Sequence, residues 1–118
     1  MFKFCLKLTT VLLIASVLHS TAMANEFKAC IKYQRADYSW SHGYKITGFV
    51  VDGDDLNDIV GSYRYHSWNK YFVIPWQEGG YTALELSSYE DTPPDYEREY
   101  QDQGQRHWKL KNGWDWCY

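Results

Sequence analysis

Apolar and polar positions alternate along most of the chain from residue 26 onward. In residues 26–34 every second residue is apolar or aromatic, from Phe27 to Tyr33. A spacing of two is the spacing at which a β-strand presents side chains to one face. Stretches of this kind, separated by short polar turns, predict strands over residues 26–34, 44–51, 56–66, 71–76 and 81–89.

The end of the chain carries a strong turn signal. Asn112-Gly113 stands between two short stretches rich in β-formers, residues 106–111 and 114–118. Asn-Gly favours a two-residue hairpin because both central turn positions need a positive φ. The sequence therefore predicts a final hairpin in which Trp114 and Trp116 share one face.

The stretch between the last two predicted strand regions breaks the alternation. Residues 90–103 contain Pro93-Pro94 and many charged side chains, so we expect a long loop. About six short strands and no clear helix predict an all-β fold, a small antiparallel sandwich or a partly closed barrel.

The first 24 residues have the pattern of a secretory signal peptide. Lys3 and Lys7 precede an apolar run over residues 8–18, and Ala22-Met23-Ala24 provides small residues for cleavage. No other run approaches the roughly 20 residues needed to span a membrane. We therefore expect residues 1–24 to be removed and residues 25–118 to form one exported, soluble β domain without membrane insertion.

The expected mature domain keeps two cysteines, Cys30 and Cys117. In an exported chain such a pair predicts one disulfide, which here would join the two ends of the domain. The pair favours an oxidising compartment such as the periplasm.

Negative charge is concentrated in one segment. Without Lys3 and Lys7 the net charge changes from −3 to −5, and residues 85–102 hold seven acids and one base. The acids are Glu85, Glu90, Asp91, Asp95, Glu97, Glu99 and Asp102, and they alternate with Tyr89, Tyr96 and Tyr100. Acids mixed with tyrosines suit contact with a basic protein surface. The alternative is a solvated loop that keeps the protein in solution.

Aromatic residues outnumber branched aliphatic ones. Residues 25–118 contain three Phe, six Trp and eleven Tyr, against twelve Val, Ile and Leu. We therefore expect a core built largely from rings. In the alternative, exposed rings stack on sugars, as in carbohydrate-binding modules, with Trp114 and Trp116 or the group Tyr63, Tyr65 and Tyr71 as candidates.

The sequence offers no strong signal for catalysis or for a metal or other cofactor. Residues 52–58 resemble a calcium loop, but Leu56 and Asn57 replace the oxygen ligand and the glycine of an EF-hand. We interpret the segment as a turn whose Asp54 and Asp55 could join an interface. The histidines lack metal-ligand spacing. An acidic chain without a basic stripe argues against nucleic acid as a partner.

A signal ending in Ala22-Met23-Ala24, a small aromatic β domain and the Cys30–Cys117 pair resemble the periplasmic immunity proteins of bacterial type VI secretion systems. The chain is similar, more narrowly, to Vibrio-like members that neutralise a lysozyme-like peptidoglycan-hydrolase domain of a secreted spike protein. The resemblance covers the whole chain in length and layout and rests on no family motif.

The resemblance implies a protein that blocks the cleft of a peptidoglycan-hydrolase effector and is not itself an enzyme. The stretch from Tyr89 to Tyr100 is the first candidate for the blocking loop, and Asp54 and Asp55 belong to the second. The first set comprises Tyr89, Glu90, Asp91, Asp95, Tyr96, Glu97, Glu99 and Tyr100. An inhibitor of host lysozyme and a carbohydrate-binding module remain alternatives, and a homodimer stays open.

Overall fold

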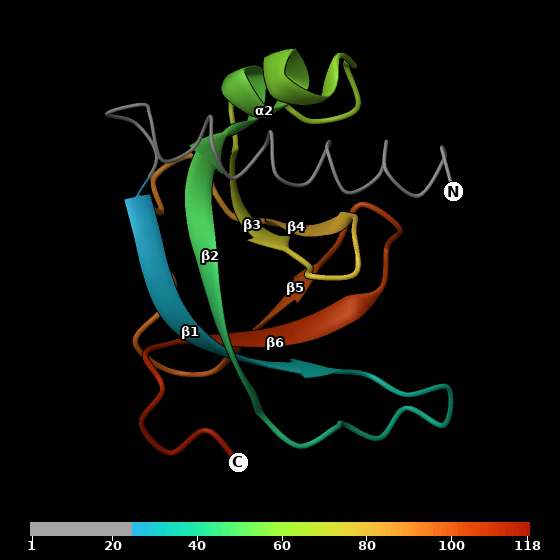
Figure 1. The fold of residues 1–118 in the computed structure, drawn as a ribbon, viewed down its shortest axis with the longest axis vertical. Helices are drawn as coiled ribbons and strands as arrows, with labels where there is room; N and C mark the ends of the chain where they lie inside the picture. The colour runs from blue at the N-terminus through green and yellow to red at the C-terminus, as the bar shows by residue number, and fades with distance from the viewer. Residues whose placement is uncertain (1–24) are drawn as a thin grey trace.

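The computed structural model describes residues 25–118, and the predicted signal peptide, residues 1–24, lies outside the described residues. The described part contains six antiparallel strands and one helix (Figure 1). In chain order they are β1 (Asn25–Tyr33), β2 (Tyr44–Asp52), α2 (Gly53–Val60), β3 (Lys70–Pro75), β4 (Tyr81–Glu85), β5 (Arg98–Gln101) and β6 (His107–Asn112).

The six strands form one curled sheet in the order β4-β3-β2-β1-β6-β5. The side chain of Gln103 bridges to the free edge of β4. It accepts a hydrogen bond from the Ala83 amide at 2.9 Å and donates one to the Tyr81 carbonyl at 2.9 Å. The sheet is therefore a nearly closed barrel, which confirms the predicted all-β fold in its barrel form.

One apolar cluster fills the inside of the barrel. In a barrel, alternate residues of each strand point inward, and the register places Val50 beside Phe72 and Phe72 beside Leu84. A Cβ added to Gly48 would lie 2.5 Å from the Phe72 ring, so glycine makes room for this ring. The buried members of this inner cluster are Ala29, Ile31, Val50, Phe72, Ile74, Leu84, Leu86 and Leu110.

A second apolar cluster covers the outer face of β2, β3 and β4. Helix α2 packs there, and Figure 1 shows it at one end of the barrel between β2 and β3. Its Leu56, Ile59 and Val60 contribute the helical half of the cluster. The buried members of this outer cluster are Phe49, Val51, Leu56, Tyr65, Tyr71, Val73 and Ala83.

The strand predicted over residues 56–66 is wrong, since Gly53–Val60 is helical and residues 61–69 form turns. The three apolar residues of α2 are spaced to lie on one helical face, and acids occupy the first turn, where they suit the helix dipole. Gly61 ends the helix in the left-handed conformation, with φ 69°. The apparent alternation further on belongs to turns around the buried Tyr65.

The predicted final hairpin is also wrong. Gly113 does have a positive φ of 83°, but residues 114–118 form no strand. Strand β6 pairs instead with β1 and β5, and the Gly113 amide donates to the Lys28 carbonyl at 2.8 Å. The tail then reaches β1, where Cys117 forms the predicted disulfide with Cys30. Pairing with distant strands thus outweighs the local turn preference.

The predicted long loop over residues 90–103 contains strand β5. Its charges did not prevent pairing because β5 is the exposed last strand of the sheet order, where charged side chains are accommodated. Glu99 pairs there with Lys109 on β6. The remaining loop covers residues 86–97.

The prediction of a core built largely from rings is wrong as well. Within residues 25–118 only four of the buried hydrophobic residues are aromatic, namely Phe49, Tyr65, Tyr71 and Phe72. Most Tyr and Trp residues keep part of the ring in solvent, as their polar tips allow. The exposed set comprises Tyr33, Tyr38, Tyr44, Tyr63, Trp68, Tyr89, Tyr96, Trp114, Trp116 and Tyr118.

Candidate functional site

The acids of the predicted binding loop mostly face their own protein. Glu90 accepts hydrogen bonds from the Ser87 amide at 3.1 Å, the Ser87 hydroxyl at 2.9 Å and the Tyr100 hydroxyl at 2.8 Å. Burial alone would raise the pKa of Glu90, but these bonds outweigh it and hold the pKa below its usual value. Glu90 therefore fixes both sides of the loop to each other.

Four more acids of this segment pair with lysines or histidines from other elements. Asp91 binds Lys70 on β3. Glu97 lies 3.0 Å from Lys32 on β1 and 3.6 Å from Lys109 on β6. Glu99 binds His107, and Glu85 binds His66, each at 2.6 Å. Most acids of the segment with the largest predicted charge thus have partners on their own barrel.

What the loop presents to solvent is a small set of side chains. Tyr89 is 82 % exposed and Tyr96 is 66 % exposed. Asp95 is exposed and makes no ion pair within residues 25–118. Pro93 between them is fully buried, and the Pro94 carbonyl accepts a hydrogen bond from the Asn112 amide at 2.7 Å. The loop is therefore held from inside and displays two rings and one free carboxylate.

The second predicted acidic site has a different local structure. Asp54 and Asp55 lie in the first turn of α2 and not in a hairpin turn. Burial, together with Asp52, Asp54 and Asp58 nearby, raises the pKa of Asp55. Within the described range 25–118 no group of three or more His, Cys, Asp or Glu could hold a metal ion.

Aromatic side chains gather at the opposite end of the barrel. The connections 34–43, 76–80 and 102–106 all lie at this end, because the strands alternate in direction. Ring centroids follow one another at 4.3 Å, 6.0 Å, 6.2 Å and 6.4 Å. We refer to this set as the ring row, and its order is His42, Tyr44, Tyr33, Trp108 and Trp76.

Hydrogen bonds fix the two indoles of the ring row. The Trp76 Nε1 donates to the Thr82 hydroxyl at 2.8 Å, and the Trp108 Nε1 donates to the Asp102 carboxylate at 2.9 Å. The side chain of Asp102 is completely buried. Burial would raise its pKa, but hydrogen bonds from Trp108, Arg106 and the Gly104 amide hold the pKa below its usual value. Ring positions set by such internal bonds are available for binding without prior ordering.

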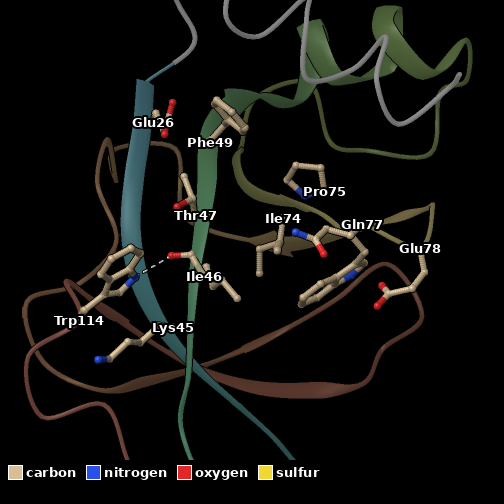
Figure 2. A pocket seen from close by; sticks show the side chains of 11 residues that line it. Glu26, Lys45, Ile46, Thr47, Phe49, Ile74, Pro75, Gln77, Glu78 and Trp114 are labelled. Carbon is tan, nitrogen blue, oxygen red and sulfur yellow. Dashed lines mark hydrogen bonds between the residues drawn. The ribbon is translucent and has the colours of Figure 1, made fainter. Parts of the chain in front are cut away.

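A groove of about 500 Å³ adjoins the ring row and shares Trp76 with it. It lies where β2 and β3 separate, because their pairing ends at Phe49 and Val73. Figure 2 shows Ile46 extending from β2 towards Ile74, with Gln77 beyond. Its lining mixes apolar and polar side chains, including Lys45, Thr47, Gln77 and Glu78.

The tryptophans singled out by sequence lie apart from one another. Trp114 lines the groove on the far side of β2, where its Nε1 donates to the Ile46 carbonyl at 3.0 Å (Figure 2). Trp116 is 80 % exposed and contacts the ring of Tyr118. Of the three predicted clustered tyrosines, Tyr65 and Tyr71 do meet, with centroids 5.0 Å apart, whereas Tyr63 is fully exposed.

The ring row escaped sequence reasoning because its five members come from five separate strands and connections. One signal could have found it. Tyr33, Tyr44, Trp76 and Trp108 each lie at or beside the end of a strand next to a connection, on the inward alternation. Aromatic residues that recur at such positions mark one end of a barrel as ring-lined.

No helix in residues 25–118 is long and apolar enough to cross a membrane. In the comparisons with known proteins, no family model, curated protein or solved structure matches the chain.

Proposed function

We propose that this protein is a periplasmic immunity protein that binds a secreted peptidoglycan hydrolase and blocks its substrate cleft. The observation that carries the proposal is the construction of the 86–97 loop. Its acids other than Asp95 bind groups of the same domain, and Tyr89 and Tyr96 face solvent. A loop already held in one conformation loses little entropy when it enters a cleft.

The chemistry of the displayed side chains suits a protein partner. Tyrosine supplies rigid contact area with a polar tip and is enriched at interfaces. The guanidinium of Arg98 lies 5.7 Å from the Tyr96 ring centroid and supports its position. Asp95 adds a carboxylate free to attract a cationic hydrolase, which would act on an anionic wall polymer. Of the acids in this segment, the proposal therefore assigns contact with the hydrolase to Asp95 alone.

Binding to a purified, secreted peptidoglycan hydrolase tests the proposal, and any such enzyme found to be encoded next to this gene is the first to assay. Tyr89→Ala and Tyr96→Ala should each raise the dissociation constant about 30-fold, as the loss of a ring at the centre of an interface does. Tyr63→Ala is the matched control, since Tyr63 is a fully exposed tyrosine in the turn after α2. Calorimetry measures affinity, and survival of cells that produce the hydrolase in their periplasm measures protection.

The outcome that contradicts the proposal is binding and protection by the Tyr89→Ala/Tyr96→Ala double variant at the level of the parent. Asp95→Lys separates steering from contact, because it should slow association and weaken its salt dependence. Glu97 and Glu99 are poorer choices for charge reversal, since Glu97 binds Lys32 and Glu99 binds His107 within the barrel. A host lysozyme assayed in parallel distinguishes the immunity role from inhibition of a host enzyme.

A further inference from the structure

We propose that the ring row and the adjoining groove form a binding site for an uncharged saccharide, separate from the loop that meets the hydrolase. The loop 86–97 connects the other ends of the strands, so the two sites lie at different places on the barrel. Binding of a sugar would thus be a second activity of the same domain.

The shape of the site suits a short saccharide. Trp76 belongs to both the ring row and the groove, so ring faces continue into a concavity of about 500 Å³. This volume lies in the range of small-ligand sites. Tyr33 and Tyr44 are 39 % and 38 % exposed, so each offers part of a ring to solvent while the rest packs inward.

The chemistry of the lining favours a sugar over other ligands with flat faces. A pyranose presents C–H groups on its faces and hydroxyl groups around its rim. The ring face of Trp76 matches the first, and the side chains of Thr47, Gln77 and Glu78 can pair with the second. Such a site recognises a ligand through both kinds of surface at once.

The charge of the groove lining favours a saccharide over a single-stranded nucleic acid, which also stacks on aromatic rings. The groove is lined by Glu26, Glu78 and Lys45, so it carries no excess of positive charge. A nucleic acid strand needs a cationic track for its phosphates. An uncharged saccharide has no such requirement.

The rigidity of the site is already built into the barrel. Thr82 on β4 and Asp102 after β5 each accept a hydrogen bond from an indole of the row. Both acceptors are buried, so the bonds are shielded from water. The two indoles therefore keep their positions whether or not a ligand is bound.

A titration of the mature protein with a soluble oligomer of N-acetylglucosamine tests this site without any hydrolase. Calorimetry and tryptophan fluorescence should show saturable binding, and Trp76→Ala should weaken it about tenfold, as for the loss of one stacking ring. Tyr44→Ala, at a more exposed position, should weaken it as well. Trp68→Ala is the matched control, because Trp68 is an exposed tryptophan at the other end of the barrel.

Three results would each contradict the proposal of a saccharide site. The first is the absence of saturable binding at about 1 mM oligomer. The second is an equal loss of affinity in Trp68→Ala and Trp76→Ala. The third is tighter binding of an oligothymidylate to the same rings. Thermal melts establish that each variant is folded, and loss of sugar binding leaves the test on the hydrolase unaffected.

Discussion

The two ends of this barrel are finished in different ways. At one end the chain lays α2 and the turns after it over the outer face of β2, β3 and β4, and buries Leu56 completely. Within residues 25–118 the connections at the other end, 34–43, 76–80 and 102–106, are shorter, and the ring row stands partly in solvent. Apolar side chains of α2 together with buried rings close the first end, whereas partly exposed Tyr and Trp rings line the second.

The difference between the two ends follows from how few aromatic side chains the inside of the barrel holds. A narrow six-strand barrel is filled by Ile, Leu and Val with a few rings, so most Tyr and Trp residues are left over for the surface. Each leftover ring has a polar tip that water or a buried acceptor can satisfy. A surface rich in fixed rings is a surface prepared for contact.

We call the end of the barrel that carries the ring row the open end and the end under α2 the covered end. The largest expected effect on stability concerns the disulfide, which lies beside the open end. A Cβ on Gly43, next to the ring row, would lie 2.8 Å from the Cys30 sulfur. Replacing both cysteines by Ser should lower the free energy of unfolding by roughly 4 kcal/mol, because the bridge closes a loop of 87 residues. Urea unfolding measures the loss. A change below about 1 kcal/mol would show that the open end holds without it.

A slightly smaller loss is expected at the covered end. Leu56→Ala should cost about 3 kcal/mol, since Leu56 is fully buried and its removal leaves a cavity between α2 and the sheet. Tyr44→Ala at the ring row should cost about 1 kcal/mol or less, because the ring is already half exposed. Denaturant melts of both variants compare the ends directly, and equal losses would remove the distinction drawn between them.

The elements that could be predicted from the sequence are those whose local pattern agrees with their burial in the fold. Strands 25–33, 44–52 and 70–75 carry patterns that agree with their burial, so local and global preferences coincide. The helix was missed because two acids and a glycine precede Leu56 and look like a turn. Its apolar spacing of Leu56, Ile59 and Val60 was present but short.

The candidate sites failed in prediction for a different reason. Counting charge along residues 85–102 could not show that Lys32, Lys70 and Lys109 come from other strands to bind these acids. Equally, no local pattern links Tyr33 to Trp108, which meet only through the pairing of β1 with β6. Both facts depend on long-range register, which a single sequence does not display.

The loop that joins the covered end to β5 should respond to pH through Glu90. Its pKa is lower in the folded protein than in the unfolded chain, so its contribution is full above the unfolded value near 4.5. The contribution is lost as the pH falls through the folded value. Glu90→Gln should cost about 2 kcal/mol at neutral pH and flatten the acid limb of stability. Urea melts from pH 7 to pH 3 measure this, and an unchanged acid limb would contradict it.

The smallest expected effect on stability comes from a substitution that should release the Trp76 indole and leave the rest of the fold in place. Thr82→Val keeps the buried shape but removes the acceptor of the Trp76 Nε1. Loss of one neutral hydrogen bond should cost about 1 kcal/mol. The indole should also become more mobile, which fluorescence anisotropy and the indole NMR signal detect.

Thr92→Val is the control for this substitution, because Thr92 is exposed in the 86–97 loop and should tolerate the change. If Thr82→Val frees the Trp76 indole while the fold stays within about 1 kcal/mol of the parent, the open end is ordered for ligand contact rather than for stability. An indole that stays fixed without Thr82 would mean that packing against Trp108 alone holds the row. The ring row would then be part of the core, and the two ends would differ less than their exposure indicates.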